Sequence, residues 1–143
     1  MKNLAAHFDN DTTTPVTVPD LTLPVLTGKV WKIVVYGRFQ TAATTTGVGL
    51  VLLAPGASII TGKETIRQAA AGTDSFFDVE LKNNPDNFAN TGITAPGTDF
   101  VLMLDALVSV AADGNLLSQF RSEVAASNAV LKAGTKLIAT RIA

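Results

Sequence analysis

The sequence has 143 residues, a formal net charge of −1 and no cysteine. This length fits one domain with a core of its own. The near-neutral charge gives no strong field to attract nucleic acid or an anionic membrane, and the lack of thiols excludes disulfides, thiolate metal sites and cysteine catalysis. Charged residues make up only 16% of the chain and apolar residues 47%. We therefore favour a protein that hides surface in an assembly over a monomer with a large core.

Residues 1–27 contain three prolines, Pro15, Pro19 and Pro24, with apolar residues between them. Prolines at this density exclude a helix and a central strand, and they allow an extended arm or an edge strand. The segment has neither the apolar run nor the cleavage site of a signal peptide, so we do not expect it to be one. We treat 1–27 as an extended N-terminal arm and 28–143 as the folded domain. The interleaved apolar residues predict that its second half is buried: Val16, Val18, Leu21, Leu23 and Val25.

From Gly28 onward the hydrophobic period is two, which is typical of strands. In KVWKIVVYGRFQ, one face carries Ile33, Val35 and Phe39, and the other carries Tyr36 and Arg38. Further strands are expected over 48–54, 76–81 and 100–110, each bounded by turn residues. Many strands of this kind predict a β-sandwich or a barrel.

The last third of the chain contains two turn signals. Asp113-Gly114 predicts a hairpin between the strand over 100–110 and a return strand that begins near Asn115. Gly134 divides the final segment, which is expected to form a hairpin or a bent strand. Residues 63–72 are the only candidate helix, and a strand with a loop fits them equally well.

The strand FVLMLDALVSV is apolar on both faces, as is VGLVLLA. One face of an antiparallel sheet usually meets water, so the second face needs a cover. That cover is either another layer of this chain, such as the N-terminal arm, or another subunit. The candidate subunit-interface residues are Val101, Met103, Asp105 and Leu107.

The motifs that carry chemistry are missing or fail in detail. His7 is the only histidine, so a histidine-based triad or metal site has little to build on. PGASIITGKET resembles a phosphate loop, but five residues separate Gly56 and Gly62, and Glu64 stands where a hydroxyl is needed. We therefore predict no enzyme, no catalytic residue, no metal and no cofactor. No stacking platform for nucleic acid and no membrane-spanning run is visible either.

Asp105 is the most informative carboxylate because its neighbours are apolar. A carboxylate in such surroundings needs a partner or a shifted pKa. Arg38, Arg121 or Lys132 across an interface is the expected partner.

The C-terminal segment NLLSQFRSEVAASNAVLKAGTKLIATRI resembles the last two strands of the C1q-like and tumour-necrosis-factor-like jelly-roll modules of tailed-bacteriophage structural proteins. Their closing pattern is an apolar–polar strand, a Thr/Ser/Asn-rich turn and a strand of the type lkaGs-l-ltri. LTGKVWKIVVYGRFQTAATTTGVGLVLLAPG is similar to their opening. Together the two segments cover about residues 24–143. Such modules often end a long fibre chain, whereas only a short proline-rich arm precedes this one.

The resemblance implies an all-β jelly-roll sandwich that forms a homo-oligomer, with a homotrimer favoured over a dimer. It implies a capsid decoration or cement protein on the virion surface, whose partners are the major capsid protein and other copies of itself. The apolar residues of the arm would then contact neighbouring capsid subunits. The terminal strand would lie inside the sheet near the subunit contact. The alternative is a tail-fibre tip or receptor-binding protein that recognises carbohydrate.

Overall fold

The computed structural model describes residues 1–68 and 75–143, which form eleven strands and no helix, so none of the described segments is a helix long and apolar enough to cross a membrane. The strands are β1 (Lys2–Asn3), β2 (Phe8–Asn10), β3 (Val16–Val25), β4 (Val30–Thr41), β5 (Val48–Leu53), β6 (Ile59–Arg67), β7 (Phe76–Leu81), β8 (Phe100–Ser109), β9 (Gly114–Ser122), β10 (Ala129–Leu131) and β11 (Lys136–Arg141).

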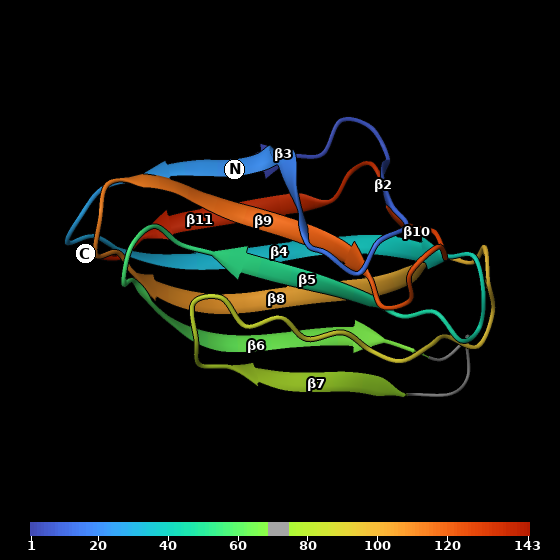
Figure 1. Ribbon diagram of the computed structural model, residues 1–143. Coiled ribbons are helices and arrows are strands. Elements are labelled where there is room, and N and C mark those ends of the chain that lie inside the picture. The colour runs from blue at the N-terminus through green and yellow to red at the C-terminus, as the bar shows by residue number, and fades with distance from the viewer. Residues whose placement is uncertain (69–74) are drawn as a thin grey trace.

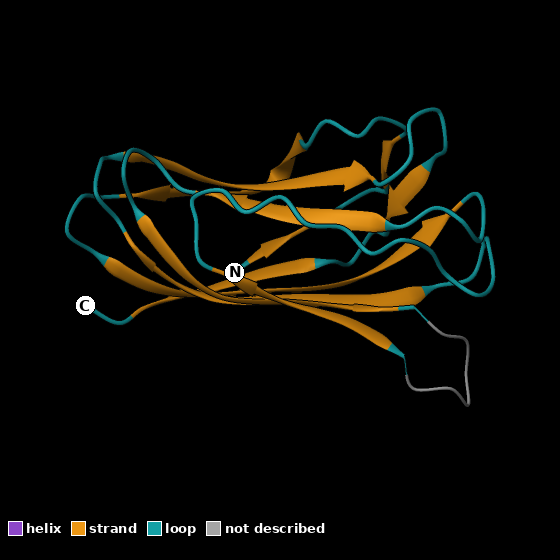
Figure 2. Ribbon diagram, turned by 60° about the horizontal axis from the view of Figure 1, so that its bottom comes forward, coloured by secondary structure: helices purple, strands orange, loops and turns teal. Residues whose placement is uncertain are grey.

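The strands form two antiparallel sheets. The large sheet has the order β1-β11-β4-β8-β6-β7, and β10 joins it by pairing with both β4 and β2. The small sheet has the order β3-β9-β5. The two sheets lie face to face as two layers (Figure 1; Figure 2). The expected all-β class is confirmed, and the arrangement is consistent with a jelly-roll sandwich.

Strand β4 shows how the sequence pattern becomes a core. Ile33, Val35 and Phe39 are fully buried between the sheets, as the period of two predicted. Tyr36 and Arg38 alternate with them and point away from the core, where both are exposed. The ring of Phe39 packs against the ring of Phe100 on the neighbouring strand β8, with centroids 5.9 Å apart. The buried side chains of both sheets form a single apolar cluster.

The final segment is a bent strand, one of the two forms expected. β10 and β11 both run antiparallel to β4 along the same edge, β10 beside Phe39–Thr41 and β11 beside 31–36. Residues 132–135 bulge out between them, opposite Gly37 and Arg38. Gly134, with φ of 88°, takes the left-handed conformation that this bulge requires. β11 lies between β1 and β4, so the terminal strand is inside the sheet.

The hairpin expected at Asp113-Gly114 is wrong. β8 belongs to the large sheet and β9 to the small one, so the connection crosses between layers. Both edges of β8 are already paired, with β4 and with β6, so β9 has no edge of β8 to pair with. Asp113 instead accepts a hydrogen bond from the backbone N–H of Thr27 at 2.7 Å, which ties this corner to the end of β3.

The structure does not show residues 1–27 as a separate arm. Val16–Val25 form β3, which pairs with β9 and makes one edge of the small sheet. The register shifts between Thr17 and Thr22, and this irregularity accommodates Pro19 within the strand. The prolines thus mark an edge strand, which is the second of the two forms that the sequence allowed.

The candidate helix over 63–72 is not present in its described part. Residues 63–67 belong to β6, which pairs with β7 and β8, and residues 69–72 lie outside the described part of the chain.

Candidate functional site

The outward face of the large sheet carries an apolar surface that we call the outer stripe, defined as Val34, Tyr36, Val101, Met103, Leu107 and Ile138. The strand register places these residues together, because Ile138 pairs with Val34 and Tyr36 pairs with Met103. Tyr36, Leu107 and Ile138 are 52%, 44% and 43% exposed, and the other three are half-buried. Large apolar side chains gathered on one open face are typical of a surface that contacts another molecule.

All four candidate interface residues lie on this face. Along β8, Phe100, Leu102 and Leu104 point into the core, whereas the alternate residues point outward. The latter include the predicted set: Val101, Met103, Asp105 and Leu107. The sequence pattern therefore placed these residues on the correct side of the sheet. Whether they contact another subunit stays a prediction.

The partner expected for Asp105 was wrong. Its carboxylate forms an ion pair with the ammonium of Lys32, on the adjacent strand β4 of the same chain. Arg38 and Lys132 lie near Asp99 instead, and Arg121 donates a hydrogen bond to Asn87 at 2.6 Å. The Lys32–Asp105 pair lies within the outer stripe, and its two side chains are 41% and 36% exposed. Such a pair contributes little to stability, in the range of about 0–1 kcal/mol.

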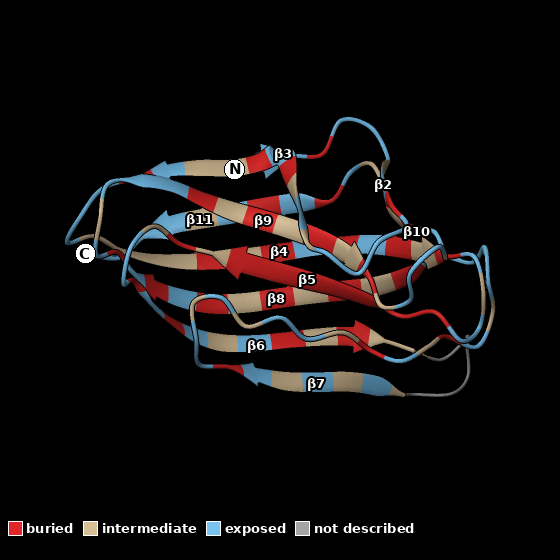
Figure 3. Ribbon diagram, viewed as in Figure 1, coloured by how far each residue is buried: buried red, intermediate tan, exposed pale blue. Residues whose placement is uncertain are grey.

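The other strand that is apolar on both faces, β5, is covered within the chain. Val48–Leu52 are all buried, and β5 is red over most of its length in Figure 3. The connection between β7 and β8 supplies the cover: a Cβ on Gly49 would lie 2.3 Å from the carbonyl oxygen of Phe88. Of these two strands, β8 has an apolar outward face that none of the described residues covers, and whether another subunit covers it stays a prediction.

Three side chains, one from β6 and two from the β7–β8 connection, also close the free edge of β5. The N–H of Val48 donates to Asn90 Oδ1 at 2.7 Å, that of Leu50 to Glu64 Oε1 at 2.8 Å, and that of Ala54 to Asn84 Oδ1 at 2.9 Å. Unpaired N–H groups on a sheet edge invite pairing with other chains, so these caps protect the strand from it.

Glu64 is a buried acid that the sequence reasoning did not single out as one. It is fully buried, and burial raises the pKa of its carboxyl from 4.5 to about 8, against the opposing effects of the Leu50 N–H and the positive charge of Arg121. The carboxyl is therefore protonated at neutral pH. The sequence does carry one signal of this burial. In a strand over 59–67, Glu64 falls on the same face as Ile60 and Ile66, which is the inward face of β6. Sealed in the core, Glu64 cannot meet a substrate.

The candidate capsid-binding residues of 1–27 divide into two groups. Val18, Leu21 and Val25 are buried in the chain's own core and cannot contact another protein, which corrects that part of the expectation. Instead, these three side chains fill the apolar core beneath the small sheet. Val16 is 43% exposed, and Leu23 is partly buried against the core.

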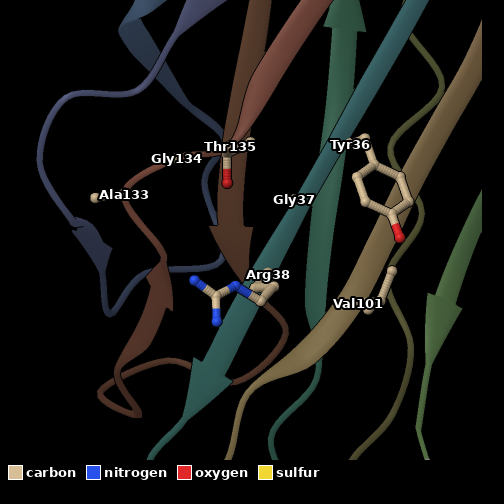
Figure 4. Close-up of a pocket in the computed structure, with 7 residues that line it drawn as sticks. All are labelled: Tyr36, Gly37, Arg38, Val101, Ala133, Gly134 and Thr135. Atoms are coloured by element: carbon tan, nitrogen blue, oxygen red, sulfur yellow. The ribbon is translucent and has the colours of Figure 1, made fainter.

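A hollow of about 170 Å³ lies at one end of the outer stripe, beside the bulge between β10 and β11. Gly37 forms its floor. Tyr36 and Val101 lie on one side, the backbone of Ala133–Thr135 on the other, and Arg38 at the end (Figure 4). Gly37 is required here, because a Cβ would lie 2.2 Å from the hydroxyl oxygen of Thr135.

The bulge beside this hollow is held by several hydrogen bonds. The N–H of Gly134 donates to the carbonyl of Leu4, and that of Ala133 donates to Nδ1 of His7 at 2.9 Å. The Thr135 hydroxyl donates to the carbonyl of Lys132. His7, the single histidine, thus supports a loop. Among residues 1–68 and 75–143, no three His, Cys, Asp or Glu side chains gather as a metal site would need.

Comparison with known proteins gives no family. No family model matches the chain, and no curated protein matches it. Two solved chains match weakly. One is from the structure of the Gt strain of infectious bursal disease virus, with 14% identity and a TM-score of 0.22, over 100% of this chain and 37% of that one. The other is from the Gx strain, with 16% identity and a TM-score of 0.21, over 97% and 34%. The chain spans about a third of their length, and similarity this low carries no argument about fold or function.

Proposed function

We propose that this protein is a non-enzymatic structural protein of a phage virion that decorates the outer capsid surface as a homo-oligomer. The observation that carries the proposal is the outer stripe, an apolar surface on the large sheet that the described part of the chain leaves uncovered. A catalytic function has less support, since among the described residues the one carboxyl with a strongly raised pKa, Glu64, is sealed between the sheets.

The outer stripe has the composition of a subunit contact. Most of its side chains are apolar, the Lys32–Asp105 pair lies among them, and Lys136 lies beside them. Interfaces between subunits commonly combine apolar side chains with a smaller number of polar groups. The second face of β5 is covered within the chain, whereas the described residues leave the outward face of β8 open, and this difference supports a second molecule as the cover over β8.

The number of subunits and the capsid partner rest on the resemblance in residues 24–143. That resemblance favours a homotrimer bound to the major capsid protein. Because Val18, Leu21 and Val25 are buried, we no longer assign capsid contact to them. Many copies on a capsid lattice would bind with avidity even where each contact is weak.

Self-association is tested with Leu107→Arg and Ile138→Arg, each placing a charge in the outer stripe. Sedimentation velocity should show an oligomer for the native chain and a monomer for both variants. Val16→Arg is the matched control, because Val16 has a similar exposure but lies on the small sheet. A native chain that sediments as a monomer at all concentrations would contradict the oligomer.

The place in the virion is tested by the copy number per purified particle, measured by quantitative mass spectrometry against the major capsid protein. We expect hundreds of copies in a simple ratio to the shell. A few dozen copies would point to the tail-fibre alternative, and absence from the particle would overturn the structural role itself.

A further inference from the structure

Strand β7 is an open edge of the large sheet. It pairs with β6 on one side, and none of the described residues pairs with its other side, where β7 forms the lower edge of the sheet in Figure 1. The free edge of β5 is capped by side chains, so the two edges of this chain are treated differently. An open edge is a place where a further strand can add to a sheet.

The register shows which backbone groups of β7 are free. The N–H of Gln68 donates to the carbonyl of Ser75, so these two residues, just beyond the ends of β6 and β7, form a hydrogen-bonded pair. Such pairs alternate along an antiparallel ladder, which directs the N–H and C=O groups of Asp78 and Glu80 away from β6. Within residues 1–68 and 75–143, these four groups have no hydrogen-bond partner. They are available to an added strand.

The connection that follows β7 closes the edge only at its end. There the N–H of Lys82 donates to Asp86 Oδ2. A shallow hollow of about 370 Å³ is lined by residues 78–80 of β7 and by Lys82, Asp86 and Phe88 of the connection. Phe88 is 37% exposed. A strand that adds to β7 would therefore enter a hollow that has an aromatic ring in its lining.

The two sides of this edge differ in chemistry. Val79 pairs with Glu64, whose side chain lies in the core, so Val79 points inward and Asp78 and Glu80 point outward. The β7–β8 connection covers the core face, which places Phe88 on the side of Val79. In an added antiparallel strand, two residues would lie beside the carboxylates and the residue between them beside Val79 and Phe88. The edge therefore favours a basic–apolar–basic sequence.

A second copy of β7 does not fit this edge. Full overlap of two antiparallel β7 strands would place Asp78 directly opposite its counterpart in the other copy. Like charges in that position are destabilising. The carboxylates thus disfavour pairing between copies of this strand, and they favour a strand that brings cations.

Both carboxylates can accept such a cation. Asp78 Oδ1 accepts a hydrogen bond from the Thr65 hydroxyl at 2.5 Å, which leaves its second oxygen for a partner. Glu80 Oε2 lies 2.6 Å from the ammonium of Lys82, but the two side chains are 73% and 71% exposed. An ion pair this exposed is weak, so a cation of the added strand can replace Lys82.

We propose that the free edge of β7 binds an extended segment of another protein as an added antiparallel strand, in which basic residues flank an apolar one. Asp78 and Glu80 supply backbone donors, backbone acceptors and carboxylates, and Val79 and Phe88 contact the apolar residue. The outer stripe ends at β8, and β6 separates it from β7, so this site does not depend on self-association. A failure of either proposal leaves the other intact.

The test is a titration of the pure, isotope-labelled protein with the peptide acetyl-Lys-Val-Lys-Val-Lys-amide, followed by amide chemical shifts. Binding should fall in the range of about 0.1–1 mM. The shifts should concentrate at residues 77–81, and solvent exchange of the Asp78 and Glu80 amides should slow. The same peptide with Glu in place of Lys should bind at least about tenfold more weakly.

Methylation of the peptide backbone separates strand addition from simple charge attraction. In the proposed pairing the N–H groups of the lysines face β7. A peptide with N-methyl lysines keeps every charge and should bind at least about tenfold more weakly. A peptide with N-methyl valines is the matched control, because those N–H groups point away from β7, and its binding should be unchanged.

Variants of the protein test the carboxylates. Asp78→Asn combined with Glu80→Gln removes both charges at nearly constant shape and should weaken binding by at least about tenfold. Lys82→Ala removes the competing cation and should strengthen binding by about two- to fivefold. Asp11→Asn is the control, because Asp11 is an exposed carboxylate outside β7, and it should leave binding unchanged.

Four results would each overturn the proposal. These are no shift up to about 5 mM peptide, equal binding of the Lys and Glu peptides, binding that is indifferent to methylation of the lysines, and binding that is unchanged in the double variant.

Discussion

At the scale of single residues, Glu64 shows how one buried polar group can serve the fold while costing stability. Its Oε1 closes the edge of β5 by accepting the Leu50 N–H, but its Oε2 has no hydrogen-bond partner among the described residues. A buried carboxylate with one donor is poorly stabilised, so the neutral acid is favoured.

Glu64 should make the stability of the protein depend on pH. Because its pKa is raised to about 8 in the folded state, folding stability is greatest below the unfolded pKa and is lost as the pH rises from about 4.5 to about 8, by at most about 1.4 kcal/mol per pH unit. Glu64→Gln keeps the acceptor and cannot ionise, so its stability should be flat over this window. The measurement is urea unfolding at several pH values.

The control for this titration is Glu80→Gln, because the Glu80 side chain is 73% exposed. It should reproduce the native pH dependence. A Glu64→Gln variant with the slope of the native chain would show that ionisation of Glu64 is not the cause.

At the scale of elements, β3 and β8 differ in what covers their apolar residues. The inward residues of β3 complete the core of the small sheet, whereas the outward residues of β8 remain open. An apolar residue in a strand can therefore either fill the core or lie on an open face, and the strand pairing decides which of the two it does.

Leu21→Ala should lower the free energy of unfolding by about 2–5 kcal/mol, because Leu21 is fully buried and its loss leaves a cavity. Val16→Ala, at the exposed end of the same strand, should change it by about 0.5 kcal/mol or less. Chemical denaturation of both variants makes the comparison. Equal, small effects would mean that residues 16–25 are a detachable arm after all, as the sequence alone suggested.

At the scale of the whole molecule, the two faces of the sandwich are unlike. The core face of the large sheet is covered by the small sheet and by the β7–β8 connection (Figure 2). The opposite face carries the outer stripe. Association with a second copy through this face would stabilise the folded chain beyond what it has as a monomer.

The thermal midpoint should therefore rise with protein concentration. Association stabilises the folded state by mass action, so a hundredfold increase in concentration should raise the midpoint by a few degrees in scanning calorimetry. For Leu107→Arg the midpoint should not depend on concentration. A midpoint of the native chain that is independent of concentration would argue against association through this face.

The sequence by itself determined the all-β class and the faces of β4 and β8, and it limited the final segment to a hairpin or a bent strand at Gly134. These follow from the period of two and from local turn chemistry, which act between residues close in the chain. It also limited residues 1–27 to an arm or an edge strand through their prolines.

Only the tertiary structure decided which strands pair and which apolar faces are covered. The Asp113-Gly114 turn could not reveal that both edges of β8 are taken, and the sequence around Asp105 could not show that Lys32 is its neighbour. The hollow at Gly37 likewise brings together residues about a hundred positions apart. Such contacts depend on sheet order and register, which are set by competition among all the strands rather than by any local pattern.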